Sequence, residues 1–407
     1  MKETINKIRS LVDSREQRIV LILALMVFIA GVIYSVYLGD NIRFQDELEY
    51  HTLAENLVLK HKYTLDGVNP SAFRPPVYPF LLSIILFIGG GITSLRLINF
   101  LAFSASIFLL YLIVKNHSSA FAGLLSAVLV ICYPVLFYGS GILMTEPLGF
   151  FLFLLILLLI SSEKANSLMY FLITGLFCGL LLHTVPYYIF SLAVIFLWLI
   201  ITKKQGRTKA LSAIFLSFLL IISLWSIRNY IAFDSFVFVS THGGRALYHG
   251  NFEGASANPE SRVDYLIPSE EFANLNEIEI DNHYRTKAIE YIKDNKIKTF
   301  KLYCFKVLNY FNFQSKSTSE IGTFAKSFKD ILMLITYGPL LIFFLLRLFY
   351  IKRFRPSEFE TLLITLYLSN AFFLAILMTR IRFRLGFDLI LIAVVAMFIN
   401  NIIDSRS

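Results

Sequence analysis

Charged residues are scarce in this chain: Asp, Glu, Lys and Arg make up 16% of its 407 residues, whereas 57% are hydrophobic. The mean hydropathy of +0.67 lies far above the range of soluble globular domains. This composition excludes an ordinary water-soluble protein. Water is therefore not the main solvent of the folded chain.

Cysteine is also rare, with three residues, Cys132, Cys178 and Cys304. They form no CxxC pair and have no histidine at ligand spacing, so they indicate neither a zinc site nor a disulfide framework. The net charge of +9 does not indicate nucleic-acid binding, because Lys and Arg occur in short clusters between apolar runs. The chain also has no Gly-rich nucleotide-binding motif and no Asp-x-Asp metal motif.

Apolar runs near the roughly 20 residues needed to span a bilayer recur along the whole chain. The predicted spans cover residues 19–39, 95–114, 119–138, 143–161, 168–184, 186–202, 210–228, 331–350, 359–379 and 386–402. The predicted fold is an all-α polytopic membrane protein, with a bundle of about ten transmembrane helices and a loop domain at its outer face.

Basic clusters predict the orientation of the spans. Lys and Arg precede the first span, follow the sixth within 203–209 and follow the eighth within 347–355. All three clusters lie on one side if the N-terminus is cytoplasmic, as the positive-inside rule requires. The short apolar stretch 77–88 is interpreted as an interfacial or re-entrant helix, since an extra span there would place two basic clusters outside.

Two hydrophilic segments then fall on the outer side, 40–75 and 229–329. Within the second, 281–294 and 297–313 are expected to be helical, and the mixed Lys and aromatic residues of 297–313 predict a helix that lies flat on the membrane. The chain is predicted to comprise three parts: residues 1–228, a transmembrane region with a catalytic first outer loop; 229–329, an extracytoplasmic loop with interfacial helices; and 330–407, the C-terminal transmembrane helices.

Carboxylates gather at the outer ends of the spans. The first outer loop contains Phe44-Gln45-Asp46-Glu47-Leu48-Glu49, beside the membrane surface. A carboxylate there can serve as a general base toward a hydroxyl or as a metal ligand. Alternatively, Asp46 caps the following helix and Glu49 completes a capping box. Glu146 lies at the edge of another apolar helix, where it is either functional or favoured by the helix dipole.

Arginines gather at the same ends. Arg74, before two prolines, can hold a phosphate bidentately or snorkel at a helix start. Arg228 closes the seventh predicted span, and the segment 379–385 contains three arginines on the outer side, against the charge rule. A bound anion would explain them. His183, at the end of the fifth span, can contact a phosphate or sugar or be a satisfied polar residue.

Two glycine-bearing segments lie in the long loop, 240–245 and 248–251. Their backbones can approach a ligand closely, or they can be plain turns. The second segment ends at Asn251.

Together these motifs resemble glycosyltransferase family 39 of the GT-C superfamily, which includes the protein O-mannosyltransferases and the lipid A aminoarabinose transferase. The resemblance extends from about 39 to about 390 and is carried, in order, by Phe44-Gln45-Asp46-Glu47, Arg74-Pro75-Pro76-Val77-Tyr78-Pro79, Thr145-Glu146-Pro147, Trp225-Ser226-Ile227-Arg228-Asn229-Tyr230, His249-Gly250-Asn251 and Arg382-Phe383-Arg384. It implies a GT-C-like bundle and an inverting transfer of a sugar from a polyprenyl-phosphate-linked donor. The acceptor would be a hydroxyl of a lipid, glycan or protein at the extracytoplasmic face of the inner (plasma) membrane.

The resemblance also implies residue roles. Asp46 matches the family's base, Glu47 its acidic neighbour and Glu146 a second acid near the cavity. Arg74, Arg228, Arg382 and Arg384 are expected to bind the donor phosphate, and Tyr50, Tyr78, His183 and Asn251 to contact the substrates. No metal ligand and no cofactor are assigned; a divalent metal ion is possible but not expected. Where many relatives carry an arginine near the end of the fifth span, this chain has His183-Thr184-Val185-Pro186, so donor contacts there differ.

Two other classes compete with this interpretation. A polytopic transporter would also have about ten spans, but it predicts charges within the spans and Gly/Pro-broken helices in two halves. A polysaccharide polymerase or ligase with a diphosphate-linked donor would also need arginines at the outer face. The predicted spans show neither of these transporter features, and the acidic loop directly after the first span favours the family 39 resemblance over a polymerase or ligase.

Overall fold

The computed structural model describes residues 15–162, 167–202, 206–258, 272, 275–314 and 323–405, and within these ranges the chain is helical with no strand. Each of the predicted spans is a helix or a helix pair. They are α2 (Glu16–Leu38), α5 (Ile92–His117), α6 (Ala120–Ile131) with α7 (Pro134–Ser140), α8 (Glu146–Ser161), α9 (Leu168–Leu182), η1 (Pro186–Tyr188) with α10 (Ile189–Thr202), α11 (Arg207–Phe233), α15 (Thr323–Phe349), α16 (Glu358–Ile376) and α17 (Ile381–Asp404).

Not all of these helices are long enough to cross a membrane alone. Within the described ranges, six pass by length and composition, and a seventh does if α6 and α7, which meet at a 62° bend, count as one span. Pro134 opens α7 and has no N–H to continue the α6 ladder, which accounts for the break. The helices α8, α9 and α10 are apolar but shorter. The structure therefore supports the predicted polytopic bundle: within the described ranges six or seven of the ten predicted spans are full-length, and the other three are shorter apolar helices.

The bundle is built around α17. Within its apolar window, 78% of the residues are buried, compared with 22% in α2. A helix that is apolar on all sides belongs in the interior, whereas α2 presents much of its surface to lipid. The helices α9 and α11 pack closely, because Gly175 and Gly179 let the backbones approach: a Cβ at Gly175 would lie 2.0 Å from the Ile214 carbonyl oxygen.

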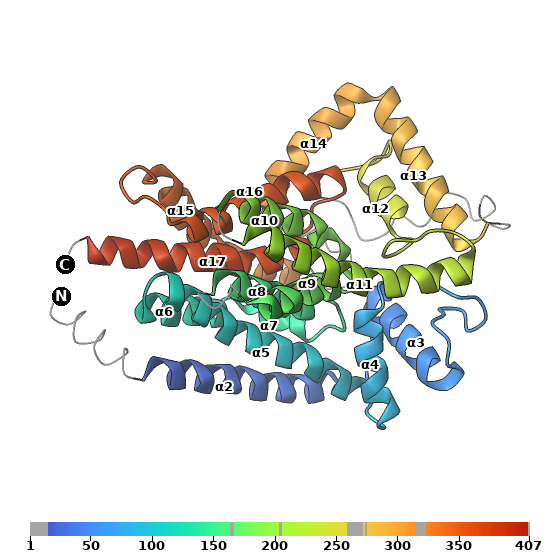
Figure 1. Ribbon diagram of the computed structural model, residues 1–407, viewed down its shortest axis with the longest axis horizontal. Helices are drawn as coiled ribbons and strands as arrows, with labels where there is room; N and C mark the ends of the chain where they lie inside the picture. The colour runs from blue at the N-terminus through green and yellow to red at the C-terminus, as the bar shows by residue number, and fades with distance from the viewer. Residues whose placement is uncertain are drawn as a thin grey trace.

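The hydrophilic segments collect at one end of the bundle (Figure 1). The start of α2 and the end of α17 lie at the opposite end, as the predicted orientation requires. Near the hydrophilic end, α3 (Gln45–Lys60) and α4 (Val77–Phe87) run across the direction of α2 and α5. The stretch predicted as an interfacial or re-entrant helix is thus a separate helix that does not continue the bundle.

The long outer segment also forms helices. They are α12 (Gly243–Gly250), α13 (Glu277–Asp294) and α14 (Lys296–Tyr310). The helix predicted over 281–294 begins earlier because Asn276 caps it and Glu279 completes the capping box. The helix predicted over 297–313 ends at Tyr310 and rests on the end of α16, where the Tyr303 hydroxyl donates to the Phe372 carbonyl over 3.2 Å.

Candidate active site

The first outer loop is fixed by Glu47, not by Asp46 or Glu49. One Glu47 carboxylate oxygen accepts from the backbone N–H groups of Arg43 and Phe44, over 2.9 and 3.1 Å, and thereby caps α3. The other accepts from Leu143 N–H over 2.9 Å, which ties α3 to the segment before α8. Glu47 is fully buried. The capping alternative for Asp46 and Glu49 is therefore wrong, and Glu47 positions the site instead of facing its cavity.

Replacement of Glu47 by alanine is expected to destabilise the protein by about 2–3 kcal/mol, because it leaves buried N–H groups without an acceptor. A thermal-unfolding measurement in detergent would show this as a lower Tm than that of the wild type. Glu49→Ala is the matched control, since within the described part of the chain the Glu49 carboxylate bonds only side chains and no backbone N–H group, so the Tm should change much less. Equal Tm values for Glu47→Ala and the wild type would contradict the capping role.

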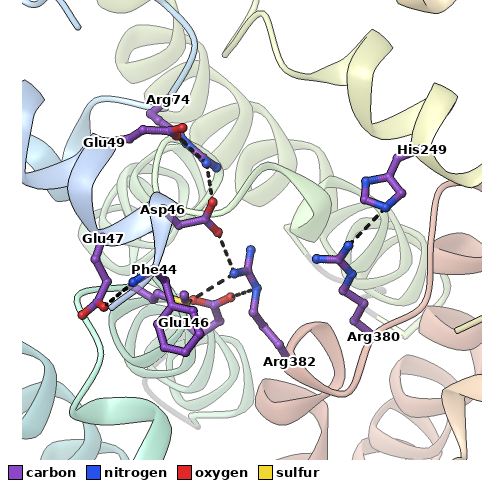
Figure 2. Close-up of polar contacts among 10 residues, drawn as sticks. Phe44, Asp46, Glu47, Glu49, Arg74, Glu146, His249, Arg380 and Arg382 are labelled. Carbon is purple, nitrogen blue, oxygen red and sulfur yellow. Dashed lines mark hydrogen bonds and ion pairs between the residues drawn. The ribbon is translucent and has the colours of Figure 1, made fainter. Parts of the chain in front are cut away.

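Asp46 lies between two arginines (Figure 2). One of its oxygens accepts from Arg74 Nη2 over 2.6 Å, and the other accepts from Arg382 Nη1, also over 2.6 Å. Burial raises the pKa of Asp46, but Arg382 and Arg74 outweigh it and hold the pKa well below its ordinary range. Asp46 is therefore ionised throughout the physiological pH range.

Each arginine also contacts a second carboxylate. Arg74 Nε donates to Glu49 over 2.7 Å, and Arg382 Nε lies 2.9 Å from Glu146 (Figure 2). The cluster thus contains three carboxylates and two guanidinium groups. In this state the positive charge of both arginines is already compensated.

The beginnings of four helices meet at this cluster. Asp46 is in the first turn of α3, Glu146 is the first residue of α8, Arg382 is in the first turn of α17, and His242 is the N-cap of α12. A helix N-terminus favours a carboxylate and disfavours a cation. The acids are thus placed favourably, whereas Arg382 is stable there because Asp46 and Glu146 compensate its charge. The converging dipoles make the region favourable for an anion.

A cavity of about 320 Å³ adjoins the cluster. Its polar wall is formed by Tyr50, Arg74, Thr145, Glu146, Thr184, Ser240, His242 and Arg382. Its apolar wall comes mainly from α10, α16 and the start of α17, and includes Ile189, Phe190, Leu374, Leu377, Met378 and Phe383. The cavity therefore offers charged groups on one side and hydrocarbon on the other.

Of the predicted site residues, Asp46, Glu146, Arg74, Arg382 and Tyr50 come together here. In the described ranges, groups of three or more His, Cys, Asp or Glu side chains arranged to hold a metal ion do not occur. The carboxylates at the cavity are instead paired with arginines.

Two predicted phosphate-binding arginines lie elsewhere. Arg228 is in the last turns of α11, where it donates to the Ser71 and Tyr63 carbonyls over 2.8 and 3.2 Å and lies over the Trp225 ring. Arg384 is fully buried within the bundle and pairs with Asp388 at 3.0 Å. The structure thus gives both arginines contacts that hold segments in place rather than contacts with the cavity.

Three predicted substrate contacts are also turned away from the cavity. Tyr78 is buried beneath Tyr50, with ring centroids 5.2 Å apart and the rings at 89°. His183 is buried and does not line the cavity, and its carbonyl accepts from Val77 N–H. Asn251 donates to the Ile376 carbonyl over 3.0 Å. These residues shape the surroundings of the cavity rather than its surface.

The sequence analysis did not single out His242, Tyr187 or Phe190 as substrate contacts, although all three line the cavity. His242 lies in the segment 240–245, whose glycines had indicated close approach to a ligand, and that was the available signal. Tyr187 and Phe190 lie in an apolar segment that carries no motif.

Comparisons with known proteins concern the family and the fold of the chain. Residues 73–227 match the family described as dolichyl-phosphate-mannose-protein mannosyltransferase. No curated protein sequence matches the chain. The apo structure of the Archaeoglobus fulgidus oligosaccharyltransferase is similar with a TM-score of 0.55 and 15% identity, over 96% of this chain and 51% of that one.

Two further solved structures are similar. AglB from Archaeoglobus fulgidus, in complex with an inhibitory peptide and dolichol-phosphate, matches with a TM-score of 0.51 and 15% identity, over 94% of this chain and 50% of that one. ArnT from Cupriavidus metallidurans bound to undecaprenyl phosphate gives a TM-score of 0.47 and 11% identity, over 93% and 77%. The chain spans about half the length of the archaeal enzyme, and at this identity the likeness concerns the fold. The chain thus has the GT-C fold, and its resemblance to glycosyltransferase family 39 is confirmed over residues 73–227.

Proposed function

We propose that the protein is an integral-membrane inverting glycosyltransferase that moves a sugar from a polyprenyl-phosphate-linked donor to an acceptor hydroxyl. The observation that carries this proposal is the Asp46 carboxylate held between Arg74 and Arg382 beside a cavity with an apolar wall. The cavity matches a donor with an anionic phosphate, a polar sugar and a hydrocarbon chain. The matching family and the AglB complex are both described with dolichol-linked phosphate, which supports a donor of this class.

The proposed reaction is a displacement at the anomeric carbon. The bond from this carbon to the phosphate oxygen breaks, the bond to the acceptor oxygen forms, and the acceptor proton passes to Asp46. The departing phosphate takes the electron pair and is stabilised by Arg74 and Arg382. Glu146, on the same wall, is suited to stabilise positive charge that develops on the sugar.

The ion pairs imply that donor binding precedes proton transfer in the proposed reaction. A phosphate that enters the cavity competes with Asp46, Glu49 and Glu146 for the same two guanidinium groups. Each bond that an arginine transfers from Asp46 to the phosphate makes Asp46 more basic, because its negative charge is then less stabilised. Donor binding would thus convert Asp46 from an ion-pair partner into a general base.

The apolar wall suits the lipid part of the donor. Its residues lie on α10, α16, the start of α17 and the connection between α16 and α17, and these helices are elements of the bundle itself. A polyprenyl chain can therefore enter from the membrane and leave the phosphate at the arginines. This geometry favours a lipid donor over a water-soluble nucleotide sugar.

The orientation and the acceptor complete the proposal. With the N-terminus cytoplasmic, the cluster faces the exterior or periplasm of the inner (plasma) membrane. The parts 1–228 and 330–407 would form the membrane region, and 229–329 would take part in binding the acceptor. A lipid, glycan or protein hydroxyl is the proposed acceptor class.

Label transfer by purified protein in nanodiscs tests this proposal. Radiolabelled polyprenyl-phosphate and polyprenyl-diphosphate sugars are offered with a membrane and cell-wall extract, with and without chelator. Transfer from a monophosphate donor is expected. Transfer from diphosphate donors alone would favour a polymerase or ligase, and solute uptake into liposomes with no transfer would favour a transporter.

A further inference from the structure

One wall of the cavity carries a histidine to which the proposed reaction assigns no role. His242 lines the cavity and packs edge-on against Phe73, with ring centroids 4.8 Å apart and the rings at 90°. Its neighbour Thr241 donates its N–H to the Ala72 carbonyl over 3.0 Å and its hydroxyl to Glu277 over 2.5 Å. The ring is therefore held in place by its backbone and by Phe73.

The imidazole has no hydrogen-bond partner at Nδ1. This atom is buried, and the described part of the protein offers it neither a donor nor an acceptor. The other ring nitrogen, Nε2, is not buried in this way and bonds no group among the described residues, so it is the ring nitrogen that a ligand can reach.

The charged surroundings keep this imidazole neutral. Burial lowers the pKa of His242, and the guanidinium groups of Arg74 and Arg245 lower it further; Asp46 opposes them and Arg382 adds to them. The pKa lies well below its ordinary value. A neutral imidazole nitrogen does not compete with the arginines for a phosphate, but it can form a hydrogen bond with a hydroxyl, which both donates and accepts.

We propose that His242 is a substrate-contacting residue, whose imidazole forms a hydrogen bond with a hydroxyl of the donor sugar or of the acceptor. This inference rests on the proposed function. In the complete proposal, Arg74 and Arg382 bind the phosphate and Asp46 takes the proton. His242 orients a hydroxyl. A residue with this role orients the hydroxyl by a hydrogen bond and does not need to carry a charge.

Kinetics of three variants test the proposal in the transfer assay. Gln places a polar atom near the position of Nε2, so His242→Gln is expected to keep transfer within about threefold of the wild type, because its amide can form the same neutral hydrogen bond. His242→Phe keeps the ring against Phe73 but cannot form the bond, and should lower kcat/KM by about 10- to 100-fold. His242→Asn, whose amide is too short, should resemble Phe.

The pattern of losses separates the explanations. A KM increase for the donor, together with slower donor hydrolysis without acceptor, assigns the hydroxyl to the sugar; a KM increase for the acceptor alone assigns it to the acceptor. Transfer at the wild-type rate by His242→Phe, at unchanged Tm, would overturn the proposal. Equal losses of kcat/KM in His242→Gln and His242→Phe, together with an altered pH profile, would also overturn it, because His242 would then carry a proton. Absence of transfer by the wild type would instead overturn the proposed function.

Discussion

Arg382→Ala is expected to lower kcat/KM for sugar transfer by at least about 10²–10³-fold, the usual effect of removing one group that stabilises a developing anion. Arg382 contacts both Asp46 and Glu146. Its loss removes a phosphate-binding cation and also leaves two neighbouring carboxylates with less compensation, so the site would repel a phosphate. The measurement is the transfer rate as a function of donor concentration, in which the donor KM should rise and kcat should fall.

Two further variants make this result specific. Arg382→Lys keeps the charge but cannot contact both carboxylates with one planar group, and should retain an intermediate rate. Arg228→Lys changes an arginine that lies outside the cavity and bonds the Ser71 and Tyr63 carbonyls, so its Tm should fall, whereas the folded variant should transfer at close to the wild-type rate. If Arg382→Ala and Arg228→Lys lost activity equally, the assignment of Arg382 to the phosphate would be wrong.

Asp46→Asn is expected to abolish turnover while donor binding persists. Asn has nearly the same shape, but it cannot take a proton, and loss of a general base costs about 10²–10⁴-fold. Removal of one negative charge leaves Arg74 and Arg382 more available to a phosphate, so the donor should bind as tightly as before or more tightly. Parallel measurements should show a donor Kd that is unchanged or lower and a single-turnover rate that is much lower than that of the wild type.

The pH dependence belongs to the same prediction. Because the pKa of Asp46 is lowered, its carboxylate is ionised at every pH above that value and becomes protonated only as the pH falls through it. Wild-type kcat/KM, which reports the free enzyme, should therefore show no acid limb from Asp46 above about pH 5. Full transfer by folded Asp46→Asn would remove Asp46 from its proposed role as the base.

The periodicity and the apolar runs predicted the helices well, because burial in a membrane imposes a strong local pattern. The helix over 77–88 and the two helices of the long loop were also predicted from local composition. Full membrane crossing was predicted less well: α8, α9 and α10 lie within the predicted ranges, but with 16, 15 and 14 residues they are shorter than a full span.

The candidate site was predicted in part, and the errors have geometric causes. Successive helical residues point about 100° apart, so Asp46 and Glu47 cannot face the same cavity, and Arg384, two residues after Arg382, points to the opposite side. The predicted span began at 386, whereas α17 begins at Ile381, so Arg384 was not expected to lie on the helix. Likewise α11 continues to Phe233, which places Arg228 within a helix instead of at its end.

The position of His242 at the cavity could not be predicted for a different reason. Its segment had a recognisable glycine pattern, but a histidine beside glycines in a long loop has no preferred role. Its contact with Phe73 joins residues far apart in the chain, and only the folded arrangement brings it to the cavity. Contacts of this kind depend on tertiary packing and leave no local trace in one sequence.

Binding of a radiolabelled polyprenyl monophosphate to the purified protein is the most direct test of the account, because it requires no knowledge of the sugar or acceptor. The account predicts saturable, salt-sensitive binding that Arg382→Ala weakens at least about tenfold, that Asp46→Asn preserves or strengthens, and that unphosphorylated polyprenol does not compete away. Equal binding by the wild type and Arg382→Ala, or no saturable binding by the wild type, would contradict it.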